Sequence, residues 1–416
     1  MRCGKAQEGP VFQPIRWARE LDEAEGFRYD LTTTTPPALE DQLLQAFLEA
    51  NPQITKVKPY RLALRLILLN LRAVECTGVP YLMVSLTNAK PPKRYNPSAA
   101  TARTLRALFD WMVGAGLLEF HRGYFNRSTR RGRRTRIRAT TRLNHLLAEE
   151  TATLLVDPRA DTIVLKNDAK HLIDYQDSAS TRAARDLVMR LNKLLAASEI
   201  VLDGRRLEGI GYRRVFNGSF DLGGRFYSAV QQLKADDRLR LLLNGEPVVE
   251  IDFSALHPRL LYKTEYMGDP YAVPGFAREA VKAAFLWGLN ARSRMGAVKV
   301  ALEHAGDEGF SLASRPEIEK LFDAVEQFHQ PISRRFFTCP ALQLQNIDAK
   351  IAELVIKEFV SRDVPVLAIH DSFIVPASFA HDLRAAMLSA YTAITGKSDA
   401  VIKVKSQSQR QTRDVA

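Results

Sequence analysis

The 416-residue chain has few cysteines and no long hydrophobic run, and both absences exclude classes of protein. Its three cysteines, Cys3, Cys76 and Cys339, lie far apart without CxxC spacing, so we expect neither a disulfide framework nor a zinc site. No segment reaches the ~18 apolar residues that span a membrane, and the N-terminal segment lacks the apolar stretch of a secretory signal. These absences favour a cytoplasmic protein without a membrane anchor.

Negative charge is scarce relative to positive charge. The chain has 59 Lys and Arg against 47 Asp and Glu, which gives a formal net charge of +12. Such an excess suggests a polyanionic partner such as nucleic acid. Clustered arginines would strengthen this interpretation, because they can neutralise several phosphates together.

Such a cluster follows a predicted helix in the segment 95–147. The helix is expected to open at Asn96, Pro97 and Ser98 and to end at Gly114 and Gly116. Its apolar face would carry Leu105, Leu108, Phe109, Met112 and Val113. Two strands are predicted at 117–125 and 136–143, and the loop that joins them carries Arg127, Arg130, Arg131, Arg133, Arg134 and Arg136.

The order of helix, strand, basic loop and strand resembles a winged helix-turn-helix module. In such a module the helix approaches a nucleic-acid groove while the basic hairpin lies along the phosphates. The alternative is a small structural domain with a solvated arginine loop, although these arginines repel one another unless an anion is present. We take residues 1–150 as a winged-helix-like nucleic-acid-binding domain.

The rest of the chain divides into a connector and a catalytic region. Residues 151–245 are predicted to form a helical connector, and the helix at 180–196 carries Leu187, Leu191, Leu194 and Leu195 on one face. This helix serves either for packing or as a thumb-like element beside a nucleic-acid channel. We expect residues 246–416 to form a catalytic region, because they contain the acids Asp252 and Asp371 within apolar runs. The polar tail from Lys405 onward is expected to fray.

Two carboxylates of the catalytic region lie at predicted strands. Asp252 is near the end of the β-rich run 248–253, and Asp371 interrupts the apolar segment 366–376 between His370 and Ser372. A buried carboxylate is costly unless it is paired or holds a metal ion, so each acid needs a partner. Two carboxylates at adjacent strand ends suit two divalent cations ~3.5–4 Å apart. Mg²⁺ is the natural choice, because it binds few carboxylates together with water and phosphates.

Between the two acids, the segment 278–291 predicts a helix with cations on one face. Arg278 and Lys282 are four residues apart, and Leu286 and Asn290 continue the same row. Such a row is suited to hold a triphosphate beside its metal ions. Taken alone, a surface helix with two ordinary cations is the simpler interpretation.

These segments together resemble a known set of motifs. The order DFS-x-L-HPR, R-x3-K-x7-N-A and HDSF resembles motifs A, B and C of the single-subunit polymerase superfamily, which comprises family A DNA polymerases and phage-type single-subunit RNA polymerases. Phe220–Ser228 is similar to the D-x-x-G-R element of those RNA polymerases, and Gln343–Ile356 to a Gln-containing helix of family A. The resemblance rests on the order and spacing of five elements. It implies an α+β fold with a right-hand polymerase core, in which an antiparallel β palm carries helical fingers.

The resemblance also implies roles for individual residues. Asp252 and Asp371 would be the catalytic pair that binds two Mg²⁺ ions, with the carbonyl of Phe253 as a further ligand. Arg278 and Lys282 would bind the triphosphate, where positive charge stabilises the phosphoryl group in transfer. Contacts with nucleic acid are expected from Arg225 at the template-primer backbone, His370 at the primer terminus, and Gln343 or Gln345 at the minor groove.

Three departures from the family pattern leave the sugar of the substrate open. His257 stands where family A DNA polymerases have a Glu that crowds the 2′-hydroxyl, so its bulk favours deoxynucleotides, although a histidine can also hydrogen-bond that hydroxyl. Asn290 and Ala291 replace the usual Tyr and Gly of the fingers helix, which removes an aromatic platform for a base. Ser372 replaces the Glu that is usual in DNA polymerases and matches the RNA polymerases.

These features favour a DNA-directed DNA polymerase that acts on a DNA template-primer with nucleoside triphosphates. No D-x-E signature of a proofreading exonuclease precedes Gly209, so we predict no proofreading. A compact polymerase joined to a DNA-binding module would suit a plasmid, phage or other mobile element. Two alternatives stay open: a single-subunit RNA polymerase or primase-like enzyme, and a non-catalytic DNA-binding initiator or regulator with a remnant palm.

Overall fold

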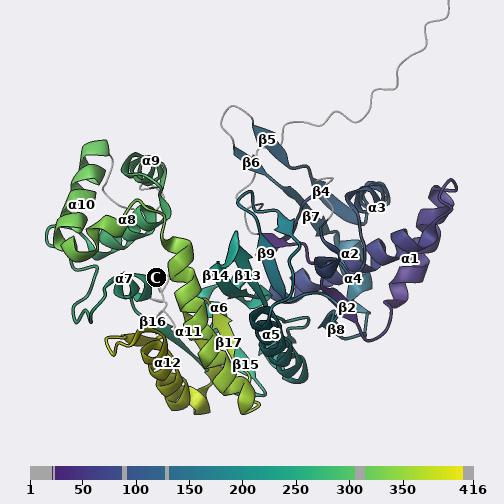
Figure 1. The fold of residues 1–416 in the computed structure, drawn as a ribbon. Coiled ribbons are helices and arrows are strands. Elements are labelled where there is room, and N and C mark those ends of the chain that lie inside the picture. The colour runs from purple at the N-terminus through teal and green to yellow at the C-terminus, as the bar shows by residue number, and fades with distance from the viewer. Residues whose placement is uncertain (1–20, 22–23, 87–90, 127–130, 305–313, 406–416) are drawn as a thin grey trace, which may run out of the picture. The chain divides into compact units, whose positions relative to one another are not determined.

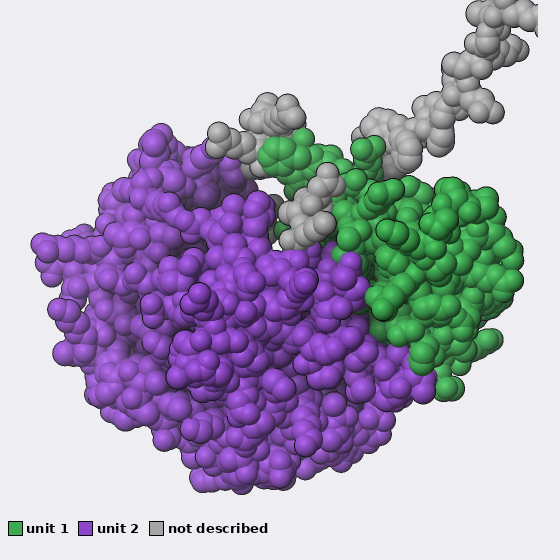
Figure 2. Space-filling model, turned by 45° about the vertical axis from the view of Figure 1, so that its right-hand side comes forward, with its two compact units in different colours: residues 1–28, 36–88, 100–151 green, residues 29–35, 89–99, 152–416 purple. Residues whose placement is uncertain are grey.

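The structure is a computed structural model that describes residues 21, 24–86, 91–126, 131–304 and 314–405 (Figure 1). The chain divides into two compact units, which Figure 2 colours separately. Unit 1 comprises Met1–Arg28, Pro36–Asn88 and Ala100–Thr151, and unit 2 comprises Tyr29–Thr35, Ala89–Ala99 and Ala152–Ala416. Within the described ranges, no helix is both long and apolar enough to cross a membrane.

Unit 1 packs helices against a small mixed sheet. Its helices are α1 (Ala38–Ala50), α2 (Val57–Thr77), α3 (Ala102–Gly114) and α4 (Thr141–Ala148). Its main sheet has the strand order β1-β3-β7-β4, formed by Ala24–Gly26, Tyr81–Val84, Thr135–Ala139 and Leu118–His121. β1 is parallel to β3, and the other neighbours are antiparallel. Phe47, Leu105 and Ile137 are fully buried, so helices and sheet share one apolar core.

Helix α3 begins later than the sequence pattern predicts. Its N-cap is Thr101, whose hydroxyl accepts a hydrogen bond from the Thr104 N–H at 3.2 Å in a reciprocal capping box. Asn96 and Ser98 bond to each other before the helix starts. The predicted apolar face is buried at Leu105, Leu108, Phe109 and Met112. The prediction for Val113 is wrong: it is 43% exposed, because each residue advances ~100° around the helix axis and Val113 turns out of the row.

The strands after α3 form an interrupted hairpin. β4 pairs with β7 in the main sheet, and β5 (Tyr124–Asn126) pairs with β6 (Arg131–Arg133) beyond it (Figure 1). The break falls at Gly123, where an added Cβ would lie 2.4 Å from the Arg133 carbonyl oxygen. The second predicted strand ends early, at Ala139, because the Thr140 hydroxyl accepts the Leu143 N–H and starts α4.

Unit 2 is built on two main sheets. The first has the order β10-β9-β13-β14, formed by Leu172–Ile173, Ile163–Lys166, Arg213–Asn217 and Ser219–Tyr227. The second has the order β12-β11-β15-β16-β18-β17, formed by Arg205–Arg206, Ile200–Leu202, Leu241–Leu243, Glu246–Phe253, Ser372–Pro376 and Leu367–Ile369. Its pairs are antiparallel, and β19 (Ile402–Lys405) adds to it beside β16. A separate pair is formed by β2 (Leu31–Thr33) and β8 (Leu154–Val156).

The helices of unit 2 pack in different places. α8 (Arg278–Asn290), α9 (Arg294–His304) and α10 (Arg315–Phe328) lie together around a core that includes Val281 and Phe322 (Figure 1). α11 (Ala341–Ser361) packs along β14 and α12 (Ala380–Thr395). The other helices are α5 (Ala179–Ala197), α6 (Ala235–Arg238) and α7 (Leu256–Leu261). Sheets and helices are thus segregated rather than alternating, which is an α+β arrangement.

Candidate active site

The antiparallel strands β16 and β18 place the two predicted acids side by side. In the strand register, Asp252 lies opposite Ser372, the residue that follows Asp371. Phe253 donates its backbone N–H to the Asp371 carbonyl oxygen at 3.2 Å, which ties the end of β16 to the turn between β17 and β18. That turn consists of His370, whose φ is 59°, and Asp371. Both acids therefore meet at one end of the second sheet.

Asp252 has an unusual protonation equilibrium. Burial disfavours its charged form and the negative charge of Asp371 adds to that effect, so the pKa of Asp252 rises to about 7. Two cations act in the opposite direction: Lys405, whose Nζ is 3.8 Å from an Asp252 carboxylate oxygen, and Lys282 on α8. They do not restore the ordinary pKa. The acid pair therefore carries more negative charge than its surroundings compensate, which favours a bound divalent cation.

A third acid beside the pair, Glu250, is already neutralised. Its buried carboxylate accepts two hydrogen bonds from the Arg238 guanidinium, at 3.0 and 3.1 Å. The Lys405 Nζ lies 2.6 Å from the same carboxylate, and the Ser372 hydroxyl donates to it at 2.8 Å. Burial alone would raise the pKa of Glu250, but Arg238 and Lys405 outweigh it and lower that pKa. Glu250 is thus a structural acid rather than a metal ligand.

The prediction that the tail frays from Lys405 is therefore wrong at its first residue. β19 extends to Lys405, and its pairing with β16 sets Lys405 opposite Glu250 and Lys403 opposite Asp252. A lysine ammonium held by two neighbouring carboxylates belongs to the site. The rest of the predicted tail, 406–416, lies outside the described residues.

The cations predicted on α8 have weak partners of their own. The Arg278 Nε lies 2.7 Å from an Asp269 carboxylate oxygen, and the Lys282 Nζ lies 3.5 Å from Glu279. All four side chains are 40% exposed or more. Exposed ion pairs of this kind contribute ~0–1 kcal/mol, so Arg278 and Lys282 can exchange these partners for another anion at little cost.

Helix α8 also borders the acid pair electrostatically. The charge of Lys282 lowers the pKa of Asp252, against the effects of burial and of Asp371. Tyr271, just before α8, is buried, which raises its pKa to about 12 against the opposing charge of Arg278. The Arg278 guanidinium lies 4.9 Å from the Tyr271 ring centroid, and the charge of Asp371 also acts on the Tyr271 hydroxyl. The cations Arg278 and Lys282 and the acids Asp252 and Asp371 are therefore close enough to influence one another's surroundings electrostatically.

A second polar cluster joins β14, α7 and α11. The buried carboxylate of Asp348 accepts hydrogen bonds from the Arg225 Nε at 3.0 and 3.1 Å and lies 2.7 Å from the His257 Nε2. The same Nε2 also lies 3.1 Å from the Arg225 Nη2, so an acid and a guanidinium both meet this one ring nitrogen. Burial disfavours the charged guanidinium, but the ion pair with Asp348 outweighs it and raises the pKa of Arg225. Arg225, expected at the template-primer backbone, thus has an internal carboxylate partner.

His370 links this cluster to the acid pair. Its ring lies edge-on to Tyr227, with centroids 5.5 Å apart. Burial, helped by the charge of Arg225, lowers the pKa of His370, so its ring is neutral at pH 7. Its Nδ1 is buried and has no hydrogen-bond partner among the described residues. His370 also has a positive φ, which costs a non-glycine residue of order 1–3 kcal/mol and is typical of functional positions.

The remaining predicted residues of unit 2 lie on flanking helices. Asn290 ends α8, and its side-chain amide donates to the Leu286 carbonyl oxygen at 2.9 Å. Gln343 of α11 is exposed and accepts a hydrogen bond from Arg335 at 3.2 Å, whereas Gln345 is half-buried.

Of the six arginines predicted for the basic hairpin, the structure describes four. Arg127 and Arg130 lie outside the described residues. The structure places the others in or near β6 and β7, namely Arg131, Arg133, Arg134 and Arg136. Arg136 contradicts the prediction of a phosphate contact, because it is only 7% exposed and its Nε donates to the Leu21 carbonyl oxygen at 2.8 Å. It lies in the middle of unit 1's main sheet, between β3 and β4.

The acid pair fits magnesium ions whose coordination a substrate completes. Mg²⁺ in nucleotide-processing sites is held by one or two carboxylates together with water and substrate phosphates. Asp252 and Asp371 supply two carboxylates beside His370, whose buried Nδ1 has no hydrogen-bond partner among the described residues. The part of the chain that the structure describes contains no group of three or more His, Cys, Asp or Glu suited to a complete metal cage. The described residues thus offer a divalent cation the two carboxylates of the acid pair and no complete cage.

No family model and no curated protein sequence matches the chain. Among solved structures, it is similar to the POL domain of Pol1 from M. smegmatis in complex with DNA primer-template and dNTP, at 12% sequence identity and a TM-score of 0.29. The match covers 88% of this chain and 65% of that chain, so this chain spans about two thirds of the other's length at most.

Sequence reasoning missed Glu250, Lys405 and Asp348. Glu250 had a usable signal, because it lies two residues before Asp252 and strand alternation puts both on the same face. Lys405 and Asp348 had none, since their partners come from elements distant in sequence.

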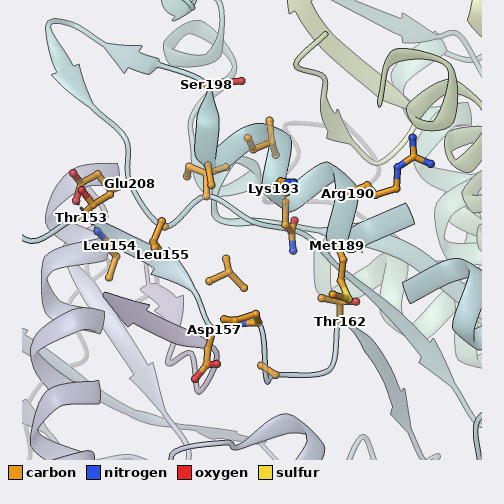
Figure 3. A pocket seen from close by; sticks show the side chains of 18 of the residues that line it. Thr153, Leu154, Leu155, Asp157, Thr162, Met189, Arg190, Lys193, Ser198 and Glu208 are labelled. Carbon is orange, nitrogen blue, oxygen red and sulfur yellow. Dashed lines mark hydrogen bonds between the residues drawn. The ribbon is translucent and has the colours of Figure 1, made fainter. Parts of the chain in front are cut away.

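Unit 2 also has an apolar pocket that does not include the acid pair (Figure 3). Its volume is ≈ 490 Å³, and α5 and the segments 153–162 and 206–210 line it. Two polar side chains on its wall are engaged internally: Asn192 bonds the backbone of Tyr212 at 3.0 and 2.6 Å, and Glu208 accepts the Leu154 N–H at 3.2 Å. We assign this pocket no part in the site.

Proposed function

We propose that the protein is a template-directed nucleotidyltransferase, specifically a DNA-directed DNA polymerase without proofreading. The observation that carries the proposal is the meeting of Asp252 and Asp371 at one end of an antiparallel sheet, with the cations of α8 beside them. Paired carboxylates with excess negative charge need divalent cations, and neighbouring exposed cations suit a triphosphate.

In the proposed reaction, a primer 3′-hydroxyl attacks the α-phosphorus of a nucleoside triphosphate, a new P–O bond forms and pyrophosphate leaves. Asp252, Asp371 and the Phe253 carbonyl would hold Mg²⁺, whose charge favours the ionised hydroxyl and the leaving pyrophosphate. Arg278 and Lys282 would exchange their weak surface partners for the triphosphate. The strained turn at His370 would border the primer terminus.

The second polar cluster would orient the nucleic acid and the sugar. Asp348 holds Arg225 and the ring of His257, so the ring is fixed by a buried acid rather than free to rotate. A fixed ring leaves less room for a 2′-hydroxyl, which supports deoxynucleotides. Gln343 or Gln345 would face the minor groove of the nascent pair. For unit 1 we propose a winged-helix-like role, in which the exposed arginines of the hairpin contact phosphates.

Primer extension tests the proposal. Asp252→Asn and Asp371→Asn should each abolish incorporation while leaving affinity for a primer-template nearly unchanged. Asp382→Asn, an exposed acid of α12 paired with Arg362, serves as the matched control and should extend normally. If either active-site variant extends a primer at the wild-type rate, the acids are not catalytic. Offering dNTPs and NTPs separately, with and without a primer, distinguishes the proposed enzyme from an RNA polymerase or primase. Binding without incorporation under all these conditions would favour a non-catalytic initiator.

A further inference from the structure

The β5–β6 hairpin of unit 1 exposes an aromatic side chain that the core does not use. Phe125 is 66% exposed, although phenylalanine is among the most often buried residues. Across the hairpin it pairs with Gly132, which has no side chain to cover the ring. An added Cβ at Gly132 would lie only 2.8 Å from the Phe125 Cδ2. The ring therefore lies against the opposite strand's backbone and turns most of its surface to solvent.

The same hairpin concentrates positive charge. Arg122 and Arg134 are exposed at its base. Burial is the main cause that lowers the pKa of Arg136, and the positive charges of Arg133 and Arg134 lower it further. These guanidinium groups therefore lie close enough to repel one another. The sequence contains no acidic residue from 122 to 137, so the exposed Arg122 and Arg134 have no carboxylate within the hairpin. Such a surface needs an anionic partner.

We propose that this hairpin binds single-stranded nucleic acid by stacking Phe125 on an unpaired base while Arg122 and Arg134 contact the flanking phosphates. Single-strand binding combines aromatic rings that stack on bases with cations that follow the backbone, and both lie here on one short hairpin. The inference rests on the proposal that unit 1 binds nucleic acid, and adds base contact to the phosphate contacts proposed above. It does not depend on catalysis by unit 2.

The partner is single-stranded rather than duplex, because a base can stack on Phe125 only if one face of that base is free. A base inside an intact duplex is covered on both sides by its neighbours, whereas an unpaired base can be splayed out and stacked on an aromatic side chain. A second copy of the chain is disfavoured as the occupant of this surface. Two such hairpins would bring their arginines together without any acid between them.

The test uses the full chain in EDTA, without nucleotides, and measures its affinity for a labelled single strand and a blunt duplex of equal length. Phe125→Ala should weaken single-strand binding by about 5- to 160-fold, the range found for losing one stacked base, and leave duplex binding unchanged. Phe125→Leu should lose nearly as much affinity, since it keeps apolar bulk but not the ring, whereas Phe125→Trp should retain affinity. Phe328→Ala removes another exposed phenylalanine, 43% exposed on α10, and should have no effect.

Salt dependence separates stacking from phosphate contacts. Phe125→Ala should leave the slope of log Kd against log salt unchanged, because stacking releases no counterion. Arg122→Ala and Arg134→Ala should each reduce the magnitude of that slope by about 0.7 on the single strand. The indole of Phe125→Trp should additionally lose fluorescence when the single strand is added, a direct signature of ring–base contact.

The outcomes distinguish base stacking by Phe125 from the more general proposal that unit 1 binds nucleic acid. If the arginine variants bind with wild-type affinity and slope, unit 1 does not contact nucleic acid and both ideas fail. If the arginine variants weaken binding but Phe125→Ala does not, only the stacking contact fails. An equal loss on the blunt duplex would overturn the assignment to an unpaired base. A change in oligomeric state by light scattering, with oligonucleotide affinity unchanged, would assign Phe125 to self-association instead.

Discussion

The raised pKa of Asp252 predicts that Asp252→Asn stabilises the metal-free protein although it abolishes catalysis. In the unfolded chain this carboxyl titrates near 3.8, and in the folded chain its pKa is about 7. Below pH 3.8 the carboxyl is protonated in both states and has no effect on stability. As pH rises through the window from 3.8 to about 7, the unfolded chain loses the proton first, so the folded state is progressively destabilised. Above pH 7 the whole penalty is present.

The magnitude follows from the size of the shift. At ~1.4 kcal/mol per pKa unit, the difference between 3.8 and about 7 sets an upper limit of roughly 4 kcal/mol. The Asp252 side chain is 32% exposed, so solvent screening reduces the expected penalty to about 1–3 kcal/mol. Asparagine carries no charge at any pH, and the variant is free of this penalty.

Urea unfolding in EDTA at pH 4.5 and pH 8 measures this effect. At pH 8 the free energy of unfolding of Asp252→Asn should exceed that of the wild type by about 1–3 kcal/mol, and at pH 4.5 the two should nearly coincide. Mg²⁺ with a nucleotide should stabilise the wild type and not the variant. Asp382→Asn should show neither the pH-dependent gain nor the loss of the Mg²⁺ response. A variant that is less stable than the wild type at pH 8, or whose gain does not depend on pH, would refute the reasoning.

Three further predictions concern the surroundings of the acid pair. Arg238→Ala should lower the free energy of unfolding by about 3–5 kcal/mol, measured with urea, because it removes the main partner of the buried Glu250. Lys282→Ala should raise the KM for dNTP by about tenfold or more, with a smaller change in primer-template affinity, since it removes a charge from the proposed triphosphate site. His257→Ala should lower the kcat/KM preference for dNTP over NTP by about tenfold or more if the ring excludes the 2′-hydroxyl. An unchanged ratio would contradict that role.

Short apolar runs in the sequence predicted the strands that carry the acids. The runs around Asp252 and Asp371 are interrupted only by polar residues, and both became antiparallel strands with the acids at one end. Such runs bury both faces, so their length and β-branched content determine the element without help from distant residues.

Helix ends and distant partners were harder to predict. The start of α3 is decided by one capping box at Thr101, and several hydroxyl residues nearby are equally good caps by type. Arg136 belongs to an arginine-rich run, but its pairing between two strands buries it, and a run of like residues does not reveal which member faces inward. In the sequence, Lys405 begins a polar segment that predicts a tail, and only the pairing of β19 with β16 places it opposite Glu250.

Ser372 is a further residue whose partner the sequence does not reveal, and its identity does not indicate whether the proposed substrate carries ribose or deoxyribose. Its side chain is 1% exposed, and its hydroxyl donates to the buried Glu250. A glutamate at this position would place a second carboxylate beside Glu250, in a buried site whose cations already pair with the first. The serine is therefore explained by Glu250, an acid that the sequence motif does not include. The proposed sugar preference therefore rests on His257, whose ring Asp348 holds through Nε2 at 2.7 Å.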